Sequence, residues 1–297
     1  MIAALARAGG ALRRFRPDAV LGFGGYVSLP VGLAAVLARV PLALHEQNSL
    51  PGLANRVLSR WAREVGVTYE SSLKHLGKPE RVRVTGNPVR PAVLGADRRR
   101  GRATLGVPDE ATLLLVFGGS RGARHLNETL LEMAPALMKL PGVHVVHSTG
   151  RQEHATVERA LAARTPEAGR RYRVVPYIDT MGDALAAADL VVSRAGATSI
   201  AEITAVGRPA VLVPYPYATD DHQTLNARAV AQAGGAVVVA DADLGQTVFA
   251  DAVLRLLHDP ARRERMAESA AELARPDATA DVAELALRAA REGRERR

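Results

Sequence analysis

Short runs of apolar and β-branched residues alternate along the chain with longer stretches rich in Ala, Leu and Arg. This alternation is typical of parallel sheets whose strands are joined by helices. In the first part, strands are predicted near 19–21, 42–44, 65–68 and 82–85, with helices near 28–37 and 51–60. In the second part, strands are predicted near 112–117, 144–147, 173–175, 190–192, 210–213 and 236–239, each followed by a helical pattern. The pattern therefore predicts an α/β fold.

A polar, proline-bounded and arginine-rich segment, residues 86–102, separates these two parts. Such segments commonly connect domains, so we expect a boundary near residue 90. Near the end of the chain, Val282, Leu285, Ala286 and Ala289 recur at helical spacing and leave the charges on the other faces. This spacing predicts a final amphipathic helix that docks on the rest of the protein.

The amino-acid composition excludes several classes of functional site and of binding partner. The 297 residues suggest two domains, and the absence of cysteine excludes disulfides, iron–sulfur clusters and thiol nucleophiles. The formal charge of +8 favours anionic partners, whereas 4% aromatic residues disfavour single-stranded nucleic acid, so we expect no nucleic-acid partner. The longest apolar stretch, residues 27–44, is broken by Pro30, Arg39 and Pro41, so we expect no membrane-spanning segment.

Three glycine-containing turns each follow a predicted strand and precede a predicted helix: Gly22–Tyr26, Gly118–Arg124 and Ser193–Glu202. Turns of this kind expose backbone N–H groups to an anion, and a helix N-terminus attracts phosphate. The second turn could hold a diphosphate, although it is neither a Walker A loop nor a complete dinucleotide fingerprint. Ordinary strand-to-helix turns would also use glycine. Ser199 and Glu202 also fit a capping box, and the alternative is that Glu202 binds a ribose.

Two polar segments also follow predicted strands, His45–Asn48 and Asp220–Asn226. In open α/β sheets ligands gather at the carboxyl ends of strands, which makes both segments candidate sites. A solvated loop is the alternative for the first segment. For the second, a metal site lacks further convincing ligands, and Asp at a helix start is usually a cap. We therefore expect no metal and no cofactor.

In their order, these motifs resemble one family, the membrane-associated glycosyltransferases that add N-acetylglucosamine to lipid I and so make lipid II for peptidoglycan. Nearly the whole chain takes part in the resemblance. The residues that carry it are Gly24–Ser28, His45–Asn48, Gly86–Arg90, Gly118–Arg124, Ser193–Ala197 and Asp221–Gln223.

The resemblance implies the type B plan of two Rossmann-like domains. Residues 1–90, with 276–297 crossing back, would form the acceptor-side domain, and residues 91–275 would bind UDP-N-acetylglucosamine. It also implies the partners lipid I, linked to undecaprenyl, and an anionic membrane surface, at the cytoplasmic face of the bacterial cell membrane as a peripheral protein.

The resemblance assigns roles residue by residue. Glu202 would bind the ribose, Ile178 would contact uracil through its backbone, and Arg194 would support the nucleotide pocket. The remaining assignments are Ser120, Thr198 and Ser199 for the diphosphate, Asn48, His222 and Gln223 for sugar hydroxyls, and Tyr26 and Arg90 for the lining of the cleft. His45 and Glu46 are candidates for the general base of an inverting displacement by the muramoyl 4-hydroxyl.

One departure from the family pattern stands at the amino terminus. The family begins with a strand and a Gly-Gly-Thr-Gly-Gly-His loop, which this sequence does not contain. About two βα units, on the order of 70 residues, are therefore expected to be missing, which would impair the acceptor site more than the donor site. The alternatives are a UDP-N-acetylglucosamine 2-epimerase, another type B glycosyltransferase, or a nucleotide-sugar-binding fragment with impaired catalysis.

Overall fold

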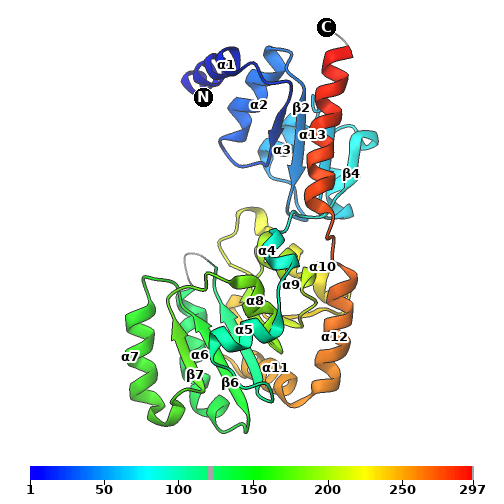
Figure 1. Cartoon of the computed structure of the whole chain (residues 1–297). Coiled ribbons are helices and arrows are strands. Elements are labelled where there is room, and N and C mark those ends of the chain that lie inside the picture. The colour runs from blue at the N-terminus through cyan, green and yellow to red at the C-terminus, as the bar shows by residue number, and fades with distance from the viewer. Residues whose placement is uncertain (120–122, 296–297) are drawn as a thin grey trace. The chain divides into compact units, whose positions relative to one another are not determined.

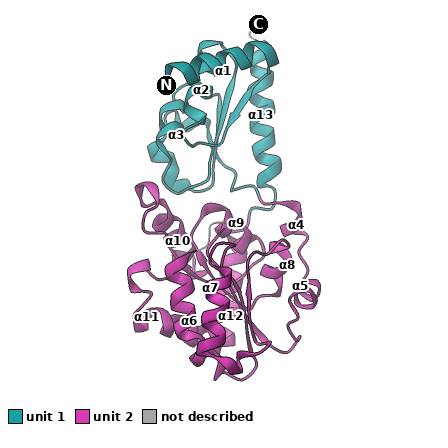
Figure 2. Ribbon diagram, turned by 90° about the vertical axis from the view of Figure 1, so that its left-hand side faces the viewer, with its two compact units in different colours: residues 1–88, 275–297 teal, residues 89–274 magenta. Residues whose placement is uncertain are grey.

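The computed structural model describes residues 1–119 and 123–295, which form two compact units. Unit 1 comprises residues 1–88 and 275–297, and unit 2 comprises residues 89–274, as Figure 2 shows by colour. The chain thus leaves the first unit at Pro88 and returns to it at Arg275. The sequence predicts these two unit boundaries at residues 90 and 275.

Unit 1 is built on a parallel sheet with the strand order β1-β2-β3-β4. Its strands are β1 (Val20–Gly22), β2 (Leu42–Glu46), β3 (Glu64–Val67) and β4 (Val82–Val84). Its helices are α1 (Ile2–Phe15), α2 (Ser28–Leu37), α3 (Leu53–Leu58) and α13 (Ala278–Glu295), with the 3-10 turns η1 (Glu70–His75) and η2 (Pro79–Arg81). Strand β2 is buried along its whole length, which explains its continuous apolar start.

The final helix of the chain, α13, packs against β2 and β3 of unit 1 (Figure 1). Val282, Leu285 and Ala289 are buried, as their helical spacing predicts. Gly66 on β3 allows this close approach, because a Cβ atom there would lie 2.7 Å from the Leu285 side chain. The predicted docking of the last helix is confirmed.

Unit 2 is built on a parallel sheet of six strands, within the described residues, with the order β10-β9-β8-β5-β6-β7. The strands are β5 (Thr112–Phe117), β6 (Val143–Ser148), β7 (Tyr172–Val175), β8 (Leu190–Arg194), β9 (Ala210–Val213) and β10 (Ala236–Val238). The helices are α4 (Pro91–Leu94), α5 (Arg98–Leu105), α6 (Arg124–Met138), α7 (His154–Arg164), α8 (Met181–Ala187), α9 (Ala197–Ala205), α10 (His222–Gln232), α11 (Thr247–His258) and α12 (Pro260–Glu272), with the 3-10 turns η3 (Pro166–Ala168), η4 (Thr219–Asp221) and η5 (Asp241–Asp243). The predicted α/β class and parallel strands are confirmed.

The central strand β5 contributes side chains to two apolar cores, one on each face of the sheet. Leu114 and Val116 join the core made with α6, α7 and α11, whereas Leu113, Leu115 and Phe117 join the core made with α5, α8 and α9. Alternation along the strand places successive side chains on opposite faces, and both faces are covered by helices. This two-sided burial is why the strand reads as an unbroken apolar run.

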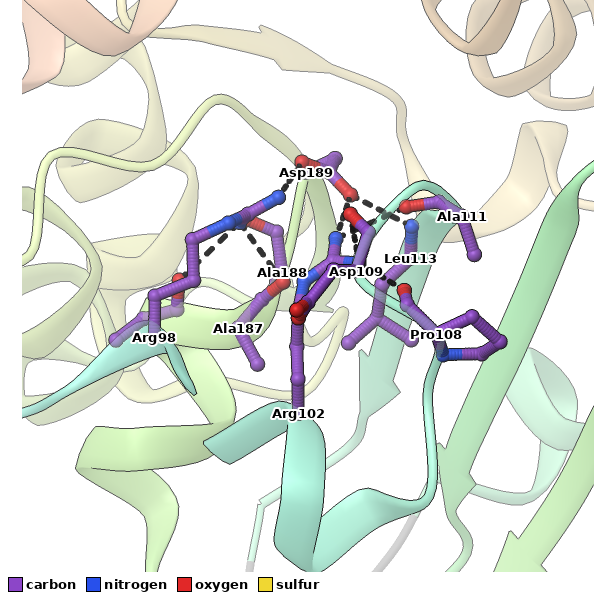
Figure 3. Close-up of polar contacts among 10 residues, drawn as sticks. Arg98, Arg102, Pro108, Asp109, Ala111, Leu113, Ala187, Ala188 and Asp189 are labelled. Carbon is purple, nitrogen blue, oxygen red and sulfur yellow. Dashed lines mark hydrogen bonds and ion pairs between the residues drawn. The ribbon is translucent and has the colours of Figure 1, made fainter. Parts of the chain in front are cut away.

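An ion cluster around the buried Arg102 lies at the amino-terminal edge of this sheet (Figure 3). The Arg102 side chain is 2% exposed, and its Nη2 lies 2.7 Å from Asp189 Oδ2 and donates to Ala111 O at 2.9 Å. Arg98 Nη2 reaches the other oxygen, Asp189 Oδ1, at 2.6 Å. Asp189 also accepts a bond from the backbone N–H of Leu113. The cluster therefore joins α5 to the starts of β5 and β8.

Candidate functional site

The order of the strands in unit 2 locates a ligand site. β5 pairs with β6 on one side and β8 on the other, so the connections leaving β5 and β8 diverge at this point of the sheet. In open α/β sheets ligands bind outside the carboxyl ends of the strands at such a reversal. Two of the predicted glycine turns, those after Phe117 and Arg194, stand there. Ser120, predicted to contact the diphosphate, lies outside the described residues.

Helix α9 begins at this switch point with Gly196 as its N-cap. Ser199 therefore lies inside the helix rather than at its cap, and the capping-box interpretation of Ser199 and Glu202 is wrong. Thr198 is exposed in the first turn, and Ser199 is partly exposed. The first turn of a helix carries free N–H groups and a partial positive charge, which suits a phosphate.

Glu202 lies within α9, and its side chain is 8% exposed. Its Oε1 accepts two hydrogen bonds from Arg90, from Nε at 3.2 Å and from Nη2 at 2.9 Å. Arg90 stands just before α4, and 61% of its side chain is exposed. The structure thus brings together two predicted binding residues that are far apart in the sequence, and the Arg90 guanidinium compensates the buried charge of Glu202.

Arg194, at the end of β8, is 10% exposed and braces the neighbouring loops. Its Nη1 donates to Val213 O at 3.4 Å and to Pro214 O at 3.2 Å, and its guanidinium lies over the Tyr215 ring. Nη1 also forms an ion pair with Asp241 Oδ1 at 2.5 Å. These contacts fit the predicted supporting role of Arg194.

The loop after β9 carries the predicted sugar-binding residues. His222 Nδ1 lies 2.7 Å from Thr219 O, and Gln223 Oε1 accepts a bond from Tyr215 N at 3.0 Å. Asp221 precedes α10 with a φ of 51°, and its carboxylate accepts from the Thr224 hydroxyl at 2.6 Å. Left-handed backbone is uncommon outside glycine and marks sites held by their surroundings. Ile178, in the loop after β7, is 6% exposed and packs in the core beside this edge.

In unit 1, His45 and Glu46 end β2 and are buried. His45 Nε2 donates to Gly86 O at 2.8 Å, and Nδ1 accepts from Gln47 at 3.0 Å. Burial lowers the pKa of His45, so the ring is neutral near pH 7. Both ring nitrogens are therefore engaged, which does not favour His45 as the proton acceptor of a reaction.

Glu46 organises the loop that follows β2. Its Oε1 accepts from Asn48 N at 3.0 Å and Asn48 Nδ2 at 3.2 Å, and its Oε2 accepts from Gly52 N at 3.1 Å and Asn55 Nδ2 at 2.8 Å. These four hydrogen bonds are accepted by both oxygens of the carboxylate and fix the conformation of the loop. Tyr26, by contrast, is 94% exposed in the glycine turn after β1.

Sequence reasoning missed two further residues at the carboxyl edge of unit 2, Asp241 and His125. Asp241 Oδ2 lies 2.9 Å from His125 Nδ1, and its other oxygen contacts Arg194. Asp241 comes two residues after the predicted strand at 236–239, so the rule that ligands gather at strand ends could have found it. Within the part of the chain that the structure describes, no three His, Asp or Glu side chains converge as metal ligands.

Three comparisons bear on this arrangement. The model of the glycosyltransferase family 28 C-terminal domain matches residues 113–282, and that of the N-terminal domain matches residues 2–67. The UDP-N-acetylglucosamine–N-acetylmuramyl-(pentapeptide) pyrophosphoryl-undecaprenol N-acetylglucosamine transferase of Desulforudis audaxviator is 43% identical, over 98% of this chain and 81% of that protein.

Among solved structures, MurG of Acinetobacter baumannii is 32% identical, with a TM-score of 0.74 over 96% of this chain and 77% of that one. The UDP-GlcNAc 2-epimerase of Neisseria meningitidis, bound to UDP-GlcNAc, has a TM-score of 0.69 over 96% of this chain and 80% of that one. At 15% identity, the epimerase shows likeness of fold alone. The two matched domain models and the transferase relative agree with the two units described above: the chain belongs to glycosyltransferase family 28.

Proposed function

We propose that the chain transfers N-acetylglucosamine from UDP-N-acetylglucosamine to the muramoyl 4-hydroxyl of lipid I, forming lipid II with inversion. The observation that carries this proposal is the 43% identity to a transferase named for that reaction, over 98% of the chain. The switch point of unit 2 supports it independently, because a nucleotide is the ligand that such an edge commonly holds. The resemblance noted from the motifs leads to the same reaction.

In this proposal the uridine diphosphate lies at the carboxyl ends of β5 and β8. Glu202, held by Arg90, accepts hydrogen bonds from ribose hydroxyls, and the first turn of α9 faces the phosphates. His222 and Gln223, both in the first turn of α10, contact the sugar in this proposal. Negative charge develops on the diphosphate as its bond to the sugar breaks, and fixed N–H dipoles stabilise that charge without reorganising.

The proton of the acceptor hydroxyl needs a base. His45 and Glu46 use their hydrogen bonds to hold the structure of unit 1 around the end of β2. The proposal therefore assigns the role of general base to neither residue. Buried groups whose acceptor atoms are already occupied cannot approach a hydroxyl to hydrogen-bond distance without breaking those bonds.

The test is binding followed by product analysis on the full chain. Calorimetry is expected to show UDP binding, and incubation with UDP-N-acetylglucosamine and a lipid I analogue is expected to give a disaccharide product and UDP. Formation of UDP-N-acetylmannosamine instead would identify the 2-epimerase alternative. Absence of any heat or thermal shift with millimolar UDP would reject the donor site.

We also propose that unit 1 binds the anionic cytoplasmic face of the bacterial membrane as a peripheral protein. No helix in residues 1–119 or 123–295 is long and apolar enough to cross a bilayer. Helix α1 has no buried residue, and Arg13 and Arg14 stand in its last turn beside Phe15, which is 82% exposed. An exposed helix with arginines and apolar side chains suits the interface of an anionic bilayer.

Replacing Arg14 by glutamine is expected to weaken binding to phosphatidylglycerol vesicles about fivefold, since one arginine near such a surface contributes about 1 kcal/mol. Vesicle co-sedimentation at low salt measures this change. Arg159→Gln removes the same charge from an exposed position on α7 of unit 2 and serves as the control. An equal loss in both variants would mean that net charge, rather than α1, governs the attraction.

A further inference from the structure

The carboxylate of Asp241 connects two elements at the carboxyl edge of unit 2. Asp241 belongs to η5, which follows β10, and its side chain is 15% exposed. Its Oδ2 accepts a hydrogen bond from His125 Nδ1 at 2.9 Å, and its Oδ1 forms an ion pair with Arg194 Nη1 at 2.5 Å. Burial alone raises the pKa of a carboxyl group, but these two contacts hold the pKa of Asp241 below its usual value.

The partners of Asp241 stand at the starts of the two helices that border the switch point. His125 is in the first turn of α6, the helix that follows β5. Arg194 ends β8 and is separated from Gly196, the N-cap of α9, by one residue. β5 and β8 are hydrogen-bonded neighbours, so Asp241 holds the starts of α6 and α9 through one carboxylate.

The guanidinium of Arg194 supports the protein backbone and contacts Asp241. Its Nη1 serves Asp241 and two backbone carbonyls, and its Nε is buried without a partner among the described residues. A guanidinium held in this way acts through the backbone that it supports. The backbone in question is the turn between β8 and α9, which presents the first N–H groups of α9.

We propose that Asp241 is a positioning residue for the nucleotide diphosphate, holding the starts of α6 and α9 at the spacing that the two phosphates need. The inference rests on the proposed function, because it takes UDP to bind at this edge. Helix N-termini bind phosphate through N–H groups that must point at the oxygens, so a displaced helix start loses those bonds. The proposed ribose contact, Glu202, lies further along α9 than its first turn, so we expect it to depend less on this spacing than the phosphates do.

The experiment compares UDP with UMP on the full chain by calorimetry. Asp241→Asn keeps the shape of the side chain but loses the charge that pairs with Arg194. We expect the Kd for UDP to rise about tenfold and the Kd for UMP to rise less than threefold, as for the loss of one charge-assisted contact. His125→Leu, at a site whose side chain is 45% exposed, is the second variant and is expected to change the UDP affinity in the same direction.

Two controls separate positioning from general destabilisation. Asp243→Asn makes the same substitution in the same 3-10 turn, where the carboxylate accepts a 3.4 Å hydrogen bond from Gln246 Nε2. We expect it to leave both Kd values unchanged. Asp189→Asn destabilises the opposite edge of the sheet and is expected to lower the melting temperature without changing the ratio of UDP to UMP affinity.

The outcomes are distinct. An equal loss of UDP and UMP affinity in Asp241→Asn, or unchanged affinity for both, would overturn the positioning role while leaving the donor site in place. If the parent chain binds no UDP, the proposed function fails, and the positioning role fails with it.

Discussion

Replacing Asp189 by asparagine is expected to lower the free energy of unfolding of unit 2 by about 3 kcal/mol. Asp189 accepts from Arg98 at 2.6 Å, from Arg102 at 2.7 Å and from Leu113 N at 2.7 Å. Removing one partner of a buried ion pair leaves an uncompensated charge, which typically costs about 3–5 kcal/mol. The lower end applies here because Asp189 is 20% exposed, although Arg102 is only 2% exposed.

Burial already lowers the pKa of Arg102, and the charge of Asp189 opposes that shift. Urea unfolding followed by circular dichroism measures the change in the free energy. The matched control is Asp251→Asn, which breaks the exposed pair of Asp251 with Arg255 on α11 and is expected to cost less than about 1 kcal/mol. Similar small costs for both variants would show that water reaches Arg102 well enough to replace the carboxylate.

Replacing Glu202 by glutamine is expected to raise the Kd for UDP between about 10-fold and 100-fold. A hydrogen bond to a charged group contributes about 1.5–3 kcal/mol, and glutamine keeps the volume of the side chain while losing the charge. The Glu202 carboxylate is oriented by Arg90 and is nearly enclosed, so a ribose hydroxyl that reaches it meets a fixed acceptor. Calorimetric titration of the folded variant with UDP measures the loss.

The chain offers a close match for the Glu202 pair. Glu64 pairs with Arg83 at 3.3 Å in unit 1, with side-chain exposures of 10% and 56%, against 8% and 61% for Glu202 and Arg90. Glu64→Gln therefore breaks an equivalent pair outside the proposed donor site. We expect it to leave the UDP affinity unchanged. Normal UDP affinity in Glu202→Gln would leave the carboxylate with the role of partner to Arg90 alone.

A network inside unit 2 shows how a residue that suggests chemistry can serve the fold. His147 is fully buried on β6, with Nε2 3.0 Å from Asn127 Oδ1 and Nδ1 3.2 Å from the Tyr172 hydroxyl. Burial lowers the pKa of His147 to about 3, so the ring is neutral near pH 7. Asn127 in turn donates to Thr149 O, which ties α6 to the end of β6. A histidine whose two nitrogens are satisfied in this way stabilises the packing of its strand.

Candidate site residues could be predicted when they directly follow a strand, because parallel strands bring their carboxyl ends to one edge whatever their order. Glu202, Arg194, His222 and Gln223 were all found by that rule or by the family resemblance. The contact of Arg90 with Glu202 could not be predicted from spacing, since it depends on how the segment before α4 packs against α9. The role of Ser199 was misjudged as a possible cap because sequence cannot specify at which residue of a glycine turn the helix begins.

By itself, the sequence determined the class of the fold, the strands and the amphipathic face of the last helix. These features follow from local hydrophobic periodicity, which each segment carries independently of its neighbours. The sequence did not predict α5, because the arginine-rich segment that forms this helix was interpreted as a connection between domains. Only the tertiary structure decided that β5 and β8 lie side by side, that one partly buried carboxylate, Asp189, binds two arginines of α5, and that Asp241 connects Arg194 with His125. Those contacts join residues far apart in the chain, and the free energy of forming them depends on burial and distance, which a one-dimensional pattern does not contain.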